Sequence, residues 1–128
     1  MIPIAALLFF AAAAPAPPAG ASAFEAARKI AVANAKTAQG RKYQSVFAKA
    51  FSESQAGELG RCVERQSAPD LSPFEALAEI AANGSVEAVL VRPETNVAVC
   101  LRDSIRRHAF PRPPRPRYWT STTLRLSH

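Results

Sequence analysis

The sequence predicts an α+β fold: N-terminal helices, then a β-hairpin, a further helix and a final strand that completes a three-stranded antiparallel sheet. Three observations support this prediction. Asn83 and Gly84 stand between two apolar runs, which is typical of a hairpin turn. Residues 95–108 place apolar side chains at helical spacing, and residues 118–126 alternate as a strand does. With 128 residues, the chain is long enough for one small domain.

The N-terminal residues have the order of a secretory signal peptide. Residues 2–14 form an uninterrupted apolar run, prolines follow, and small residues stand at Ala21 and Ala23. We therefore predict a signal peptide over residues 1–23, cleaved near Ala23, and an exported protein. The alternative is an uncleaved membrane anchor, but the apolar run is shorter than the ~20 residues that a helix needs to cross a bilayer. Pro15 and the prolines after it would interrupt a longer helix.

Export decides how the two cysteines are interpreted. Cys62 and Cys100 form an even pair in a chain that is predicted to reach an oxidising compartment, so we expect a disulfide between them. Closing a loop of this length stabilises a fold by roughly 4 kcal/mol in the chain-entropy account. The spacing matches neither a redox Cys-x-x-Cys pair nor a zinc site. The predicted role of the pair is structural.

Residues 24–69 are predicted to form an N-terminal helical region. Its first helix is rich in alanine and ends at Gly40. The weak apolar face of this helix consists of Phe24, Ala27, Ala31, Asn34 and Ala38. The second helix has a stronger face, formed by Tyr43, Phe47, Ala50, Phe51 and Ser54. Because glycine weakens a helix, we expect Gly57 and Gly60 to break or kink it before the turn that holds Cys62.

The segment before Asn83 fits two structures on local rules. Ser72, Pro73 and Glu75 look like the start of a capped helix. Residues 74–82 also alternate as a strand does, however, and the strand after the turn needs a partner. We therefore predict a hairpin of residues 74–82 and 86–92. In that hairpin, Glu75 and Glu79 would lie on a solvent-exposed face.

The last third of the chain is predicted to be a helix, an extended link and a strand. Thr95 or Asn96 can cap the helix, whose last turn is basic. Four prolines between residues 111 and 116 prevent both a helix and the hydrogen bonds of a β-sheet, so this link should be extended. Tyr118 and Trp119 begin the final strand, and we expect both side chains to pack in the interior.

The positive charge is concentrated at the C-terminal end. The net charge is +6; residues 24–100 contain nine basic and nine acidic residues, whereas residues 101–128 contain seven arginines and one aspartate. Such a cluster attracts anionic surfaces, for example lipid headgroups or lipopolysaccharide. The candidate contacts are Arg102, Arg106, Arg107, Arg112, Arg115 and Arg117.

No residue pattern indicates catalysis. The two histidines, His108 and His128, stand at a helix end and at the chain end, and no Gly-rich phosphate loop or nucleophile motif is present. We predict a protein that is not an enzyme and has no cofactor, and we infer no small-molecule substrate. Arginines beside Tyr118 and Trp119 would suit single-stranded nucleic acid, but export argues against that partner.

The stretch "IAANGSVEAVLVRPETNVAVCLRDSIRRHAFPRPPRPRYWTSTTLRL" resembles the TonB carboxy-terminal domain superfamily, in particular small periplasmic members with a cysteine in the helix, and AgmX-type domains. The resemblance covers about residues 70–126, so we assign residues 70–128 to such a domain. It implies a periplasmic location, a Phe110 side chain that closes the core after the helix, and binding of an envelope protein through the sheet edge. A TonB-type energy transducer also needs a membrane anchor and a long linker, and we predict neither. A membrane-anchored energy transducer is therefore the alternative to the predicted binding function.

Overall fold

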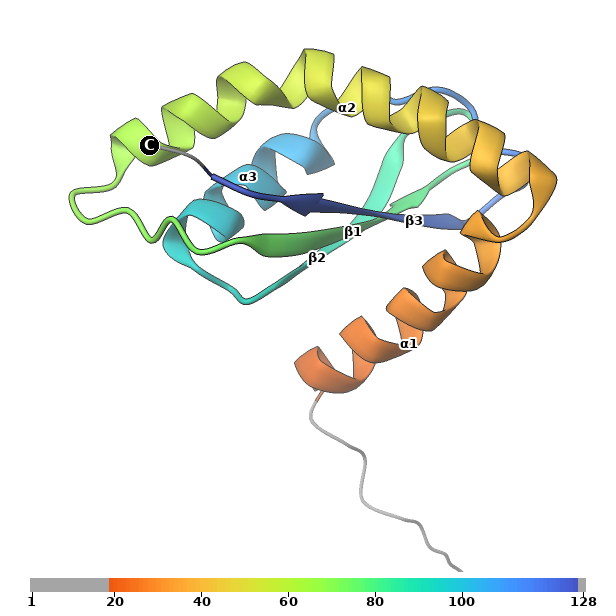
Figure 1. Ribbon diagram of the computed structural model, residues 1–128, viewed down its shortest axis with the longest axis horizontal. Coiled ribbons are helices and arrows are strands. Elements are labelled where there is room, and N and C mark those ends of the chain that lie inside the picture. The colour runs from red at the N-terminus through yellow and green to blue at the C-terminus, as the bar shows by residue number, and fades with distance from the viewer. Residues whose placement is uncertain (1–18, 127–128) are drawn as a thin grey trace, which may run out of the picture.

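The computed structural model describes residues 19–126 and confirms the predicted α+β fold class (Figure 1). Its sheet is antiparallel, with the strands in the order β2-β1-β3. The elements are α1 (Ala19–Ala35), α2 (Ala38–Arg65), β1 (Phe74–Ile80), β2 (Val86–Arg92), α3 (Asn96–Arg106) and β3 (Tyr118–Leu124). The apolar run of the predicted leader lies outside the described residues. The predicted cut after Ala23 falls within α1.

The predicted hairpin is confirmed, but its first strand is two residues shorter than expected. β1 ends at Ile80 because Ala81 enters the turn, where its N–H donates to the Ser85 carbonyl over 2.8 Å. Gly84 has φ +94°, and a Cβ at this position would lie 2.1 Å from the Phe110 carbonyl oxygen. Only glycine combines this backbone conformation with so close an approach. The turn thereby fixes both the hairpin and the start of the proline-rich link.

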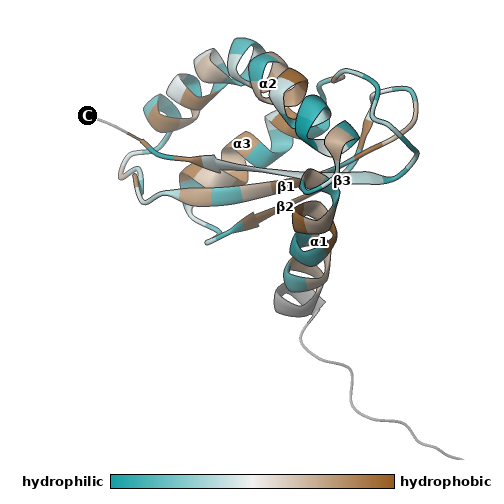
Figure 2. Cartoon of the chain, turned by 45° about the vertical axis from the view of Figure 1, so that its right-hand side comes forward, coloured by the Kyte–Doolittle hydropathy of each residue, from teal (hydrophilic) through white to brown (hydrophobic). Residues whose placement is uncertain are grey.

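Helix α1 covers one face of the sheet (Figure 2). Its apolar residues pack on Leu77 of β1, and Leu90 and Trp119 pack against the same cluster. Phe24, Ala27, Ala31 and Asn34 are buried as predicted, whereas Ala38 belongs to α2 and is exposed. The sheet face expected to be open to solvent is therefore partly covered. Glu75 is only 19% exposed in its side chain, and its Oε1 lies 3.1 Å from the Arg28 Nε.

Helices α2 and α3 cover the opposite face and enclose the main core. Phe47 is 1% exposed, and its ring centroid lies 4.9 Å from that of Phe110. Phe110 thus closes the core after α3, as the resemblance implied. Tyr118 packs in this core while Trp119 packs on the α1 side, because neighbouring strand residues point to opposite faces.

The expected break before Cys62 is wrong, because α2 continues through Gly57 and Gly60 to Arg65. Each glycine costs a helix roughly 1 kcal/mol relative to alanine, which favourable neighbours and tertiary packing can offset. Here the packing is strong: Cys62 is fully buried and forms the predicted disulfide with Cys100 of α3, with 5.7 Å between the Cα atoms. The disulfide therefore joins two helices on the same face of the sheet.

The junction between α1 and α2 also differs from the prediction. Gly40 does not end α1; it lies in the first turn of α2, where its N–H donates to the Oγ1 of the N-cap Thr37 over 2.9 Å. A Cβ on Gly40 would lie 1.7 Å from the Asn34 carbonyl oxygen. Glycine is required at this position because the two helices approach so closely. The tight junction lets α1 and α2 lie on opposite faces of one sheet (Figure 1).

Candidate functional site

The structure separates the six candidate arginines into groups with different surroundings. Arg102 lies beside two carboxylates, 3.9 Å from Glu94 and 3.8 Å from Asp103. Arg106 and Arg107 are exposed at the end of α3. The positive charge of Arg107 also contributes to the lowered pKa of the Glu58 carboxyl, after the stronger effect of the Arg61 hydrogen bond. Arg102 and Arg107 are therefore already near acidic side chains.

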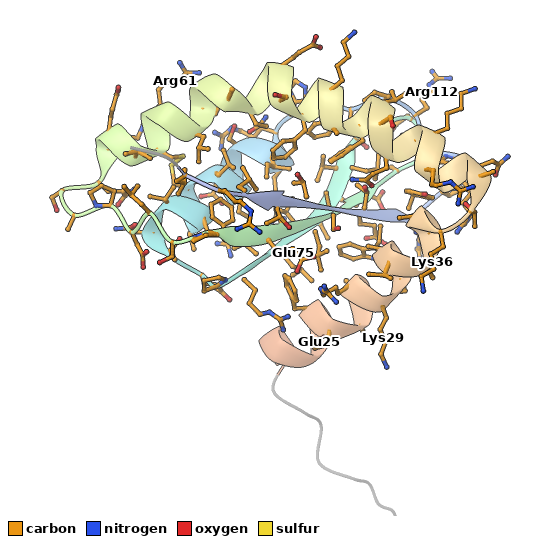
Figure 3. The ribbon with its side chains drawn as sticks, in the orientation of Figure 1. Glu25, Lys29, Lys36, Arg61, Glu75 and Arg112 are labelled. Atoms are coloured by element: carbon orange, nitrogen blue, oxygen red, sulfur yellow. A yellow bond between two sulfur atoms is a disulfide. The ribbon has the colours of Figure 1, made fainter. Side chains whose placement is uncertain are left out.

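The other three arginines, Arg112, Arg115 and Arg117, lie on the proline-rich link next to the junction of α1 and α2. This junction supplies three further exposed cations that the sequence analysis did not select. We use the name basic end for the set Lys36, Arg41, Lys42, Arg112, Arg115 and Arg117. Figure 3 shows Lys36 and Arg112 at the same end of the molecule, with Arg61 at the opposite end of α2.

A small set of polar contacts holds the link against the helices. Asn34 is buried; its Nδ2 donates to the Trp119 carbonyl over 3.0 Å, and its Oδ1 accepts a hydrogen bond from Arg115. The Arg115 guanidinium lies 5.3 Å from the centre of the Tyr118 ring. Tyr43 donates from its hydroxyl to the Pro111 carbonyl over 2.8 Å. These hydrogen bonds join residues that are 68 to 85 positions apart in sequence.

A shallow pocket of about 330 Å³ opens between α2 and the link. Lys42 and Arg112 stand on its rim, while Val46, Pro113 and Pro114 provide an apolar wall. Val46 is 44% exposed, so its apolar side chain is accessible beside the pocket. The basic end therefore combines positive charge with accessible apolar surface.

Burial raises the pKa of the Tyr43 phenol to about 12, and the nearby Tyr118 adds a smaller effect in the same direction. Burial also raises the pKa of Tyr118. The folded state therefore disfavours ionisation of the Tyr43 phenol relative to the unfolded chain, where the pKa is about 10. The contribution of the neutral phenol to the free energy of unfolding is complete below pH 10 and is lost as the pH rises to about 12.

We expect the urea midpoint of unfolding to fall between pH 10 and about 12. The variant Tyr43→Phe should show a smaller fall over this range, because only the Tyr118 contribution remains. Unfolding curves of both proteins at several alkaline pH values provide the measurement. An identical decline in the variant would show that the Tyr43 phenol is not the group responsible.

The outer edge of β3 is occupied along only part of its length. In the first half of β3, the Trp119 carbonyl accepts from Asn34, and the Ser121 carbonyl accepts from Gln44 Nε2 over 2.8 Å. Alternate residues of a strand direct their backbone groups to the same side, so Thr123 also presents its N–H and C=O outward. No hydrogen bond between residues 19 and 126 uses these outward groups of Thr123. The second half of β3 is thus open.

An apolar groove adjoins this open part of β3. Two hollows of about 250 and 420 Å³ share Ala56, Leu59 and Arg125, and together they run between the second half of α2 and the end of the chain. We call this feature the β3 groove. Its apolar lining consists of Ala48, Phe51, Ala56, Leu59, Val63, Leu124 and Leu126. Proteins commonly bind extended peptides in two ways at once: the free backbone groups of a sheet edge pair with the peptide backbone, and an adjacent groove receives its side chains.

The described residues contain neither a metal-ligand cluster nor a membrane-spanning helix. Between residues 19 and 126, no three His, Cys, Asp or Glu side chains are grouped so that they could hold a metal ion. No helix in the same range is both long enough and apolar enough to cross a bilayer.

Comparison with known proteins adds no relative. No protein-family model matches the chain, no curated protein matches it, and no solved structure matches it. The resemblance to the TonB carboxy-terminal superfamily therefore stays a prediction based on the motifs of the sequence.

Proposed function

We propose that the chain is an exported, periplasmic, non-enzymatic protein of the cell envelope that binds another protein through the edge of its sheet. The observation that supports this proposal most directly is the β3 groove beside the open half of β3. The TonB-like order of hairpin, helix, link and strand in the sequence suggests the same mode of binding.

The proposed partner contributes an extended segment. Its backbone would pair with β3 at Thr123, beyond Ser121, whose outward carbonyl is occupied by Gln44. Pairing of this kind gives affinity through main-chain hydrogen bonds, whereas pockets for alternate side chains give specificity. Apolar side chains of the segment would enter the β3 groove and contact Leu59 and Leu124. The partner segment should therefore alternate apolar and polar residues.

Photochemical cross-linking in envelope extracts tests this proposal. A benzophenone amino acid replaces Thr123, which is exposed on the β3 edge, or Ala88, which lies on the β2 edge. We expect a discrete protein adduct from position 123 and none from position 88. An adduct only from position 88 would assign binding to the other edge and contradict the proposal.

A filled groove provides the second test. Ala56 lines both hollows, so Ala56→Trp should occupy the groove and abolish the adduct. Ala38→Trp is the matched control, because Ala38 is also exposed on α2 but does not line the groove. Equal adduct yields from the two tryptophan variants would show that the groove does not take part in binding.

A further inference from the structure

We propose that the basic end is a docking surface for an anionic membrane, and that it binds the phosphate groups of lipid headgroups. This site is separate from the β3 groove. The basic end lies at the beginning of α2 and on the link, whereas the groove lies beside the second half of α2. The molecule could then hold a protein partner at one end while the other end contacts the membrane.

The first argument is that this positive charge lacks nearby compensation. Residues 26–52 contain six lysines and arginines and no carboxylate, and residues 104–128 contain six arginines and no carboxylate. The fold brings these two segments together at the basic end. The ion pairs within residues 19–126 involve Arg28, Arg61, Arg92 and Arg102, and none involves a residue of the basic end. Uncompensated charges of one sign attract a counter-charged surface.

The second argument is that two side chains of the basic end are already held in place by hydrogen bonds. Arg115 is fixed by Asn34, and Arg41 donates to the Lys36 carbonyl over 2.7 Å. Arg117 has φ +53°, a conformation that glycine or asparagine adopts at a lower steric cost. An arginine at such a position is consistent with a requirement for its charge. The restraint on Arg41 and Arg115 lowers the side-chain entropy that is lost when they bind a ligand.

The start of α2 adds to the positive potential. The first turn of this 28-residue helix contains no acidic residue, and Gln39 in that turn lines the pocket beside Lys42 and Arg112. The first N–H groups of a helix lack intrahelical partners and favour negative charge. The helix start adds to the positive potential of the basic end, but the site is defined by its six lysine and arginine side chains.

The third argument concerns the kind of anion. Val46, Pro113 and Pro114 place apolar surface among the cations, which suits a lipid interface, where charge and hydrocarbon lie close together. Single-stranded nucleic acid would need accessible aromatic rings for its bases. Tyr43 and Tyr118 beside the site are buried, and Trp119 packs against the α1 side of the sheet. The geometry therefore favours a membrane over nucleic acid.

Vesicle flotation tests the proposal on the natively purified protein. The site variant combines Lys42→Ser, Arg112→Ser and Arg117→Asn, all at exposed positions, and asparagine is chosen because it tolerates positive φ. The control variant combines Lys29→Ser, Arg61→Ser and Arg125→Ser, which removes the same number of charges elsewhere. Figure 3 shows that Lys29 and Arg61 lie away from Arg112. Thermal unfolding of both variants checks that each remains folded.

We expect the protein to bind mixed vesicles of phosphatidylcholine and phosphatidylglycerol, but not vesicles of phosphatidylcholine alone. Added salt should weaken binding, because it screens exposed charges. The site variant should bind roughly one hundredfold more weakly, since three cations near an anionic surface are lost. The control variant should bind within about threefold of the unaltered protein, as charges beyond the Debye length of about 8 Å contribute little.

Three results would overturn the proposal. Equal weakening in the two variants would mean that overall charge, and not the basic end, is responsible. Equal binding to both kinds of vesicle would show that the basic end does not recognise negatively charged headgroups, because phosphatidylcholine contains a phosphate but has no net charge. Release from the vesicles by inorganic phosphate, but not by sodium chloride of the same ionic strength, would indicate a pocket for a free anion. Because no protein partner is present, these results are independent of the proposed sheet-edge binding.

Discussion

Replacing Cys62 and Cys100 together by alanine should lower the free energy of unfolding by about 4 kcal/mol, since the disulfide restricts the unfolded chain over a long loop. The two cysteines are 38 positions apart and join α2 to α3. Small domains have total stabilities of roughly 5–15 kcal/mol, so this loss removes a large part of the stability. Chemical unfolding of the oxidised protein and of the variant under the same conditions gives the difference.

The reduced natural protein is the control for this variant. Adding a reductant to the unaltered chain should lower its stability to about that of the double-alanine variant, because both lack the same cross-link. A difference of less than about 1 kcal/mol between the oxidised protein and the variant would contradict the account. In that case the contacts between α2 and α3 alone would hold the helices together.

Phe47→Ala should destabilise the fold by about 3–5 kcal/mol, the usual range for truncating a buried aromatic residue. Phe47 is 1% exposed and contacts the rings of Tyr43, Phe51 and Phe110. Its loss would leave a cavity where α2 meets the link, and Phe110 would lose the ring whose centroid lies 4.9 Å from its own. Thermal and urea unfolding measure the effect.

The adjacent residue supplies a matched control. Val46 precedes Phe47 in the same helix but is 44% exposed, so Val46→Ala should change the stability by no more than about 0.5 kcal/mol. Similar losses in the two variants would mean that α2 is not packed with Phe47 toward the sheet. The comparison thus tests the orientation of α2 about its axis.

Local chemistry explains why much of the fold could be predicted from the sequence. Gly84 provides the positive φ of the turn, and the Oδ1 of Asn83 accepts hydrogen bonds from the N–H and the hydroxyl of Ser85. A turn at this position requires a partner strand before it, which residues 74–80 form. Thr95 caps α3 as expected, with its Oγ1 accepting from the Ala98 N–H over 3.0 Å. The disulfide followed from two cysteines and the prediction of export. For the turn and the helix cap, neighbouring residues contain the required information.

The features that were missed depend on contacts between distant segments. Gly57 and Gly60 weaken α2 locally, but burial of Cys62 against α3 outweighs this, and no local rule contains that contact. The steric role of Gly40 depends on the return of α2 toward Asn34. The spacing of apolar residues predicted an apolar face for α1. It could not show that this face covers the sheet beside Glu75.

The basic end could also be predicted only in part, because some of its cations come from a distant segment of the chain. Arg112, Arg115 and Arg117 were selected because they cluster in sequence, whereas Lys36 and Lys42 joined them only in three dimensions. One signal was available: the absence of carboxylates over residues 26–52 marks a second basic segment. Nothing in the sequence placed that segment beside the link, because the position depends on the hydrogen bond from Tyr43 to Pro111.

Export is the central claim, since the disulfide, the envelope partner and the anionic membrane all depend on it. The most direct test is the intact mass of the protein purified from cells that express its full sequence, measured before and after reduction. The account predicts a chain that begins at Phe24 and gains two hydrogen atoms on reduction. A chain that keeps residues 1–23, or one whose mass does not change with the reductant, would contradict it.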